Sequence, residues 1–271
     1  MTTSTSPVWF VTGATSGIGR ELVRQALNAG EAVTALARST AGLADLGTHD
    51  MLLPVGADVR DEAAVRGAVQ QATARFGRID VVANNAGYGT FGAVEEVTDA
   101  QARAIFDTNV FGALNVLRAA LPVLRGQRSG HILQGSSYYG QTADPGTGLL
   151  AATKYAIEGL SDALAAEVAP LGIKVTIVEP GLVATPFLGN LDMAAAIQAD
   201  YDQTVREVQK AIAALPPSAF TPAHRIAAGI RAAVTAANPP LRLSVGADGA
   251  AHMRAALTAR LADLDKSAAF S

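Results

Sequence analysis

Cysteine is absent from the 271 residues of this chain, tryptophan occurs once, and only 5% of the residues are aromatic. Without cysteine the chain has no disulfide, no thiolate metal ligand and no thiol nucleophile. It has no basic block either, and its net charge of −3 gives no reason to expect a nucleic-acid partner. No apolar run reaches the roughly 18 residues that cross a bilayer. We therefore expect a soluble protein with no membrane partner.

Two further absences narrow the class of protein. The first residues, 1–6, have neither the charged start nor the apolar core of a signal peptide, so we expect a cytoplasmic protein. The histidines lack the spacing of metal ligands, and no carboxylate cluster accompanies them, so we expect no metal site. They are His49, His131, His224 and His252.

The chain is instead rich in apolar residues: 49% are hydrophobic and 17% are charged, which is enough for one sizeable core. Short apolar runs, such as residues 8–11 and 32–37, alternate with longer helical patterns, such as residues 19–29 and 151–169. Regular alternation of this kind predicts a doubly wound α/β fold, in which helices cover both faces of a parallel sheet. We expect a single Rossmann-type domain over residues 1–271.

One segment departs from this alternation. Residues 190–215 have a helical pattern without a clear strand, and Pro216 and Pro217 end it. An insertion late in a doubly wound fold either covers a ligand pocket or packs as an extra helix. We expect residues 187–217 to form a helical insertion that covers the substrate.

A glycine-rich turn separates the first expected strand from the first expected helix. Such a turn lets the backbone approach a diphosphate closely, while the helix N-terminus adds free N–H groups and partial positive charge. Its spacing, GxxxGxG, resembles that of the short-chain dehydrogenase/reductase family, of the classical type. The expected contacts to the cofactor are Gly13, Thr15, Ser16, Gly17, Ile18 and Gly19.

Arg38 follows the second expected strand, where a nucleotide-binding fold places the adenosine ribose. A carboxylate there would favour NAD, whereas a guanidinium can bind a 2′-phosphate with two hydrogen bonds. The alternative is a solvated surface arginine. We predict that the cofactor is NADP(H).

The resemblance to this family continues over nearly the whole chain, and it implies further cofactor contacts. Asp58 and Val59 match the pair that contacts adenine, and residues 84–87 match an NNAG element that lines the cofactor channel. A Pro-Gly element near residue 180 matches the segment that holds the nicotinamide carboxamide. The residues so implied are Asp58, Val59, Asn85, Ala86, Gly87, Pro180, Gly181, Val183 and Thr185.

The same resemblance places the catalytic residues. Asn109 matches the asparagine of a proton relay, Ser137 the serine that orients a carbonyl, and Lys154 the lysine that binds the nicotinamide ribose. Hydride transfer to a carbonyl needs a nearby proton donor, which in the family is a tyrosine four residues before the lysine. Here Leu150 occupies that position, counted either from Lys154 or from Ser137.

Three explanations of Leu150 are open. Hydride transfer could persist with another donor, such as the Tyr138 or Tyr139 hydroxyl or a water relayed through Lys154 and Asn109. The fold could use NADP(H) without redox chemistry, as an isomerase, a cyclase or a binding protein. Leucine could also be a deliberate change that traps a complex. Tyr138 and Tyr139 are more simply read as packed aromatics of the pocket wall.

We expect an NADP(H)-dependent oxidoreductase that acts on a small carbonyl, alcohol, C=N or C=C substrate. The expected substrate pocket comprises Ser137, Tyr138, Tyr139, Leu150 and Phe187. The resemblance also implies a homodimer or homotetramer that assembles through the helices containing Phe111 and Lys154.

Overall fold

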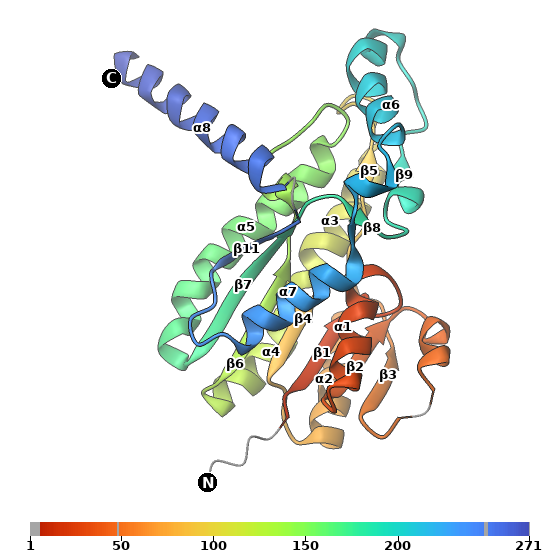
Figure 1. The fold of residues 1–271 in the computed structure, drawn as a ribbon, viewed down its shortest axis with the longest axis vertical. Coiled ribbons are helices and arrows are strands. Elements are labelled where there is room, and N and C mark those ends of the chain that lie inside the picture. Colours follow the sequence, from red (N-terminus) through yellow and green to blue (C-terminus); the bar gives the residue numbers. More distant parts are fainter. Residues whose placement is uncertain (1–5, 48, 247–248, 271) are drawn as a thin grey trace.

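Seven strands form a parallel sheet at the centre of the computed structural model, which describes residues 6–47, 49–246 and 249–270 (Figure 1). Their order is β11-β7-β6-β4-β1-β2-β3, so the direction of winding reverses between β1 and β4. This sheet confirms the doubly wound prediction. The strands are β1 (Val8–Thr12), β2 (Ala32–Ala37), β3 (Leu52–Gly56), β4 (Val81–Asn84), β6 (Gly130–Gly135), β7 (Ile173–Pro180) and β11 (Arg242–Val245).

The central strands are mostly apolar and largely buried, because helices cover both of their faces. Every residue of β1 and of β2 is buried. Within β1, Phe10 packs into the core on one face, whereas Trp9 and Val11 pack into the core on the other. The edge strand β11 is more exposed and alternates between exposed and half-buried residues.

Helices lie on both faces of this sheet. Helices α1 and α7 pack together over one face (Figure 1), and α2, α4 and α5 contribute to the core on the other. None of the helices in the described part of the chain combines the length and apolarity needed to span a membrane. The helices are α1 (Gly17–Asn28), α2 (Glu62–Phe76), α3 (Asp99–Phe106), α4 (Gly112–Gln127), α5 (Gly148–Val168), α6 (Glu207–Ala213), α7 (Ala223–Thr235) and α8 (Gly249–Ser267).

The helical insertion predicted after Phe187 is wrong for residues 191–198, which form no helix. Instead, β9 (Asp192–Met193) pairs with β5 (Thr90–Phe91), and the Asp192 and Ala194 amides donate to the Gly89 and Phe91 carbonyls, each at 2.9 Å. Pairing with a distant strand outweighs the local helical pattern. A second short pairing joins β8 (Val183–Ala184) to β10 (Thr221–Pro222).

Residues 199–213 of the insertion are helical, and a buried carboxylate ties them to the loop after β5. Glu96 is 2% exposed and forms an ion pair with Arg206. Its two oxygens also accept hydrogen bonds from the backbone amides of Gln198 and Ala93, both at 2.8 Å. These contacts hold the pKa of Glu96 at about 2, because the guanidinium and the amides favour the charged carboxylate.

Candidate active site

A cavity of about 300 Å³ opens beside the carboxyl ends of β1, β4, β6 and β7, where the strand order reverses. Ligands of doubly wound folds bind at this place. The structure brings most of the predicted site residues together around it. Those that line the cavity are Gly13, Ser16, Gly17, Ile18, Asn85, Gly87, Ser137, Tyr138, Tyr139, Leu150, Lys154, Pro180, Gly181, Val183, Thr185 and Phe187. Those outside its lining are Thr15, Gly19, Arg38, Asp58, Val59, Ala86 and Asn109.

The glycine-rich turn requires its glycines. Gly13 and Gly17 have φ values of +64° and +53°, which side chains strongly disfavour. A Cβ on Gly19 would lie 2.6 Å from Asn85 Nδ2 and closer still to the Gly13 carbonyl oxygen. Helix α1 begins at Gly17 with no acidic residue in its first turn, so its unpaired N–H groups and dipole favour an anion. This geometry suits a diphosphate.

Gly19→Ala should therefore disrupt dinucleotide binding. We expect the affinity for NADPH to fall at least ~10-fold, because the new methyl group forces the turn apart where the diphosphate would lie. Gly67→Ala in α2 is the matched control, since a Cβ there has no neighbour within 4 Å. A cofactor titration together with circular dichroism checks this. Normal affinity in a folded Gly19→Ala protein would contradict the proposed contact.

Thr12, which the sequence reasoning did not single out, ties this turn to the end of β4. Its hydroxyl oxygen accepts hydrogen bonds from the backbone amides of Asn85 and Ala86, at 2.9 and 3.0 Å. The Asn85 side chain returns a bond of 3.2 Å to the Thr12 carbonyl. The position of Thr12 at the end of an apolar strand was the sequence feature that could have pointed to this role. Thr12 thereby holds Gly13 and Asn85, which line the cavity, in place.

Two arginines and one aspartate lie after β2 and β3, outside the lining of the cavity. Arg38 is exposed, while Arg60 holds Asp58 in a two-pronged ion pair at 2.7–3.1 Å. The bond from Arg60 and the charges of both arginines lower the pKa of Asp58. Arg38 is thus near a carboxylate that is already paired with Arg60, which leaves the local charge favourable for an anion.

Val59 and Thr15 also lie outside the lining of the cavity and pack against neighbouring segments. Val59 is buried, and Asn115 of α4 holds its carbonyl with a hydrogen bond of 3.0 Å. Thr15 lies against Gly42, where an added Cβ would approach the threonine Cβ to 2.9 Å. Asn115 is a further residue that sequence reasoning missed, because an asparagine inside a helix carries no local signal of its distant partner.

Asn109 lies in a π-helical turn, Asp107–Phe111, which joins α3 to α4. Its side chain is 3% exposed and fully bonded. The amide nitrogen donates to the Tyr88 carbonyl at 2.9 Å and to Thr153 Oγ1 at 3.1 Å, and the oxygen accepts from the Tyr88 amide at 3.1 Å. Asn109 therefore fixes the loop after Gly87 against α5, next to Lys154.

Lys154 reaches the cavity from α5. Its Nζ donates to the Gly135 carbonyl at 2.8 Å and lies 3.9 Å from the point that a Cβ on Gly87 would occupy. Burial lowers the pKa of Lys154 to about 8, and the charge of Glu158 opposes that shift. The lysine can therefore gain and lose a proton near neutral pH. Ser137, on the neighbouring turn, uses its Oγ to accept the Tyr139 amide at 3.2 Å.

Leu150 lies one helical turn before Lys154, is 5% exposed, and packs with Tyr138 and Tyr139. The two tyrosine rings have centroids 4.1 Å apart. The Tyr139 hydroxyl donates to Asp144 at 3.0 Å, and burial raises the pKa of Tyr139 far above its ordinary value. This phenol is therefore a weak acid with its proton already engaged.

The Pro180–Gly181 turn and the segment after it cover the cavity from β7. The Gly181 amide donates to the Val245 carbonyl at 3.1 Å, which joins the turn to β11. Thr185 packs over the first turn of α1, because a Cβ on Gly17 would come within 3.1 Å of its methyl group. Phe187 lies over Gly89, whose missing side chain leaves room for the ring. This segment thus lies against the glycine turn at Gly17 and against the loop after β4 at Gly89.

Comparison with known proteins agrees with this geometry. A family model described as short chain dehydrogenase matches residues 7–196. Oxidoreductase BOA17 of Botryotinia fuckeliana is 37% identical over 244 residues, which are 89% of this chain and 89% of that protein. A short-chain dehydrogenase from Streptomyces avermitilis has a TM-score of 0.90 at 35% identity, covering 99% of this chain and 98% of its own.

Solved structures of this fold bind either nicotinamide dinucleotide. A short chain dehydrogenase from Burkholderia cenocepacia in complex with NADP has a TM-score of 0.77 at 26% identity, covering 96% of this chain and 97% of its own. A short chain dehydrogenase/reductase from Burkholderia phymatum in complex with NAD has a TM-score of 0.79 at 23% identity, and each chain is 94% covered.

Proposed function

Since this chain belongs to the short-chain dehydrogenase family, we propose that it is an NADP(H)-dependent oxidoreductase acting on a carbonyl, alcohol, C=N or C=C substrate. One observation carries the proposal: the glycine turn, Lys154 and the Pro180–Gly181 turn meet around a single cavity. The glycines fit a dinucleotide, because a Cβ on Gly13, Gly17 or Gly19 would press against Asn85, Ala86, Thr185 or the Gly13 carbonyl and displace the turn beside the cavity. When bound, the nicotinamide supplies or accepts the hydride.

In this proposal some residues of the chain bind the cofactor and the substrate, and others move the proton. The α1 N-terminus binds the diphosphate, Arg38 the 2′-phosphate, and Lys154 the nicotinamide ribose. Ser137 orients the substrate oxygen. Tyr138, Leu150 and Phe187 give the substrate chamber an apolar wall, which excludes water from the reacting carbon.

The proton in carbonyl reduction comes from Lys154 in this proposal. Leu150 has no transferable proton, and the Tyr139 hydroxyl is held by Asp144. The Lys154 ammonium lines the same cavity, and its pKa of about 8 makes its proton available near neutral pH. Its N–H bond breaks as the substrate alkoxide gains the proton, and the neutral amine then takes a proton from water.

Direct tests are a cofactor titration and an assay of NADPH consumption against ketones, quinones and imines. Saturable NADPH binding with turnover of any of these classes supports the proposal. A second candidate function is that of a dinucleotide-binding protein or an isomerase. It is favoured by Leu150, which lines the cavity, is buried and has no acidic proton. Binding without turnover, or product without net NADPH change, would identify it.

Arg38→Asp tests the preference for the phosphorylated cofactor. We expect the ratio of NADPH to NADH affinity to fall at least ~10-fold, because a charge-assisted bond to phosphate contributes about 1.5–3 kcal/mol. Arg66→Asp makes the same charge change on α2, where Arg66 pairs with Glu62 at 2.6 Å, and should leave the ratio unchanged. An unaltered ratio in Arg38→Asp would exclude Arg38 as the phosphate ligand.

A further inference from the structure

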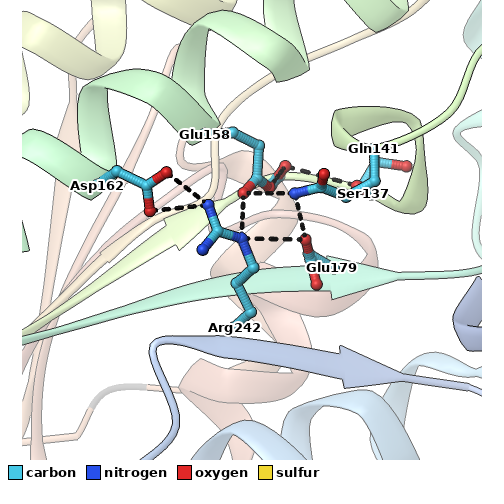
Figure 2. A network of polar contacts seen from close by, with 7 residues as sticks. Ser137, Gln141, Glu158, Asp162, Glu179 and Arg242 are labelled. Carbon is cyan, nitrogen blue, oxygen red and sulfur yellow. Dashed lines mark hydrogen bonds and ion pairs between the residues drawn. The ribbon is translucent and has the colours of Figure 1, made fainter. Parts of the chain in front are cut away.

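Behind the cavity, between α5, β7 and β11, lies a network of buried polar side chains (Figure 2). Glu158 Oε1 accepts from Ser136 Oγ at 2.5 Å, and Glu158 Oε2 accepts from Gln141 Nε2 at 3.1 Å. The same Gln141 nitrogen donates to Glu179 Oε1 at 3.2 Å. One amide group thus joins two carboxyl groups.

Arg242 closes the network from β11 (Figure 2). Its Nε donates to Glu158 at 3.0 Å and lies 3.8 Å from Glu179, while its outer nitrogen donates to both oxygens of Asp162 at 2.7 Å. One cation therefore faces three carboxyl groups. Glu158 and Glu179 are 5% and 3% exposed, so two charges there would repel each other with little screening.

A proton relieves this repulsion. Burial and the Glu158 charge raise the pKa of Glu179 to about 7, and a hydrogen bond between the two carboxyl groups acts in the same direction. The other charged groups facing the pair are Lys154 and Asp162 on α5, Arg242 on β11, and Arg260 on α8, which donates to the Gln141 carbonyl. The pair thus holds one proton below neutral pH.

Four members of the network are adjacent in sequence to segments of the active site. Ser136 precedes Ser137, and Gln141 follows the same turn. Glu158 lies one helical turn after Lys154, and Glu179 directly precedes Pro180 and Gly181. Gly140 leaves no space between them, since a Cβ there would fall 2.5 Å from Ser136 Oγ and 2.7 Å from Glu158 Oε1. A shift of either carboxyl group therefore moves the turns that face the nicotinamide.

We propose that Glu158 and Glu179, bridged by Gln141, share one proton and thereby position the Ser137 turn, Lys154 and the Pro180–Gly181 turn for the nicotinamide half of the cofactor. These are positioning residues, and the proposal rests on the proposed dinucleotide-dependent function. Loss of the proton to solvent leaves two like charges opposite each other with Arg242 shared between three carboxylates. The carboxyl groups then separate, and the cofactor binds more weakly.

The shared proton should make the stability of the fold depend on pH, and unfolding experiments can measure the direction of that dependence. Glu179 has a higher pKa in the folded chain than its ordinary 4.5, so the folded state binds the proton more tightly. The stability it contributes is present below pH 4.5 and is lost as the pH rises through about 7. In Glu179→Gln this loss disappears, because the amide does not titrate and keeps its hydrogen bond. An unchanged pH dependence of unfolding in Glu179→Gln would overturn the shared proton.

Cofactor affinity tests the positioning step. We expect the Kd for NADPH of the unmodified protein to rise roughly 3–10-fold through neutral pH relative to that of Glu179→Gln. The affinity of Glu179→Gln should match the low-pH value until Lys154 loses its proton near pH 8. Glu179→Leu, which cannot bond Gln141, should bind weakly at every pH. Glu62→Gln makes the same change at an exposed position of α2, outside the network, and should retain the profile of the unmodified protein.

The outcomes separate this inference from the proposed function. If NADPH binds but Glu179→Gln follows the same pH profile as the unmodified protein, the positioning role is wrong and the function stands. If the folded protein binds no dinucleotide at any pH, the proposed function fails and the positioning role fails with it. A flat profile in both proteins, with Glu179→Leu equally tight, would also overturn the inference.

Discussion

Leu150→Tyr is expected to raise kcat for carbonyl reduction by about 10²–10⁴-fold, the usual contribution of a general acid. The new phenol would line the cavity one helical turn from the Lys154 ammonium, which lowers the pKa of a neighbouring hydroxyl. NADPH affinity should change little, because Leu150 packs with Tyr138 and Tyr139 rather than with the glycine turn. The change in kcat is measured as steady-state NADPH oxidation with a substrate found among the ketones, quinones and imines.

Leu149→Tyr is the matched control for that experiment. It adds the same phenol to the adjacent position of α5, which is outside the cavity lining, and should leave kcat unchanged. If Leu150→Tyr binds NADPH normally but turns over no faster, the chemistry of this site does not lack a proton donor. A fall in turnover would instead show that Leu150 contributes its shape to the substrate chamber.

Lys154→Met should lower kcat by at least ~10²-fold and weaken NADPH binding about 10-fold. Methionine fills the same space without a charge, so both the proton source and the bond to the ribose are removed. In the unmodified protein, kcat for reduction should fall as the pH rises through about 8, because only the ammonium form donates. Stopped-flow single turnovers across that range separate this step from cofactor binding.

The control for Lys154→Met is Lys210→Met on α6, where the lysine is exposed and paired with Glu207 at 2.8 Å. It should leave both parameters unchanged. Full NADPH affinity in a folded Lys154→Met protein would exclude the ribose contact. A pH profile of kcat without a descending limb near 8 would exclude Lys154 as the proton source. The NADPH titration would still test its role in binding.

The parts of this fold that sequence predicted are those governed by local pattern. β1 and β2 are buried apolar runs between turn residues, and their ends were predicted within one residue. The first helical pattern was placed at residues 19–29, and Gly30, directly after it, has a φ of +73°. The positions of Gly13, Gly17 and Gly19 around one turn likewise follow from local spacing, because a strand, a tight turn and a helix succeed each other there.

The parts that sequence did not predict depend on contacts between distant segments. Gln141, Glu158 and Glu179 are ordinary polar residues in the sequence, and only the fold brings their side chains together. The β9 segment has a helical pattern, but its amides find partners on β5. No local pattern reports a partner that lies 100 residues away. Asn115 and Thr12 escaped notice for the same reason.

Helix α8 extends away from the rest of the molecule (Figure 1), yet its first turns pack against residues that line the cavity. Met253 packs with Tyr138, Tyr139 and Leu150, and Arg260 lies over the Tyr155 ring. Beyond that point Leu261 and Leu264 are exposed. A stop codon placed after residue 261 would therefore spare catalysis, whereas one placed before residue 249 would open the substrate chamber to water.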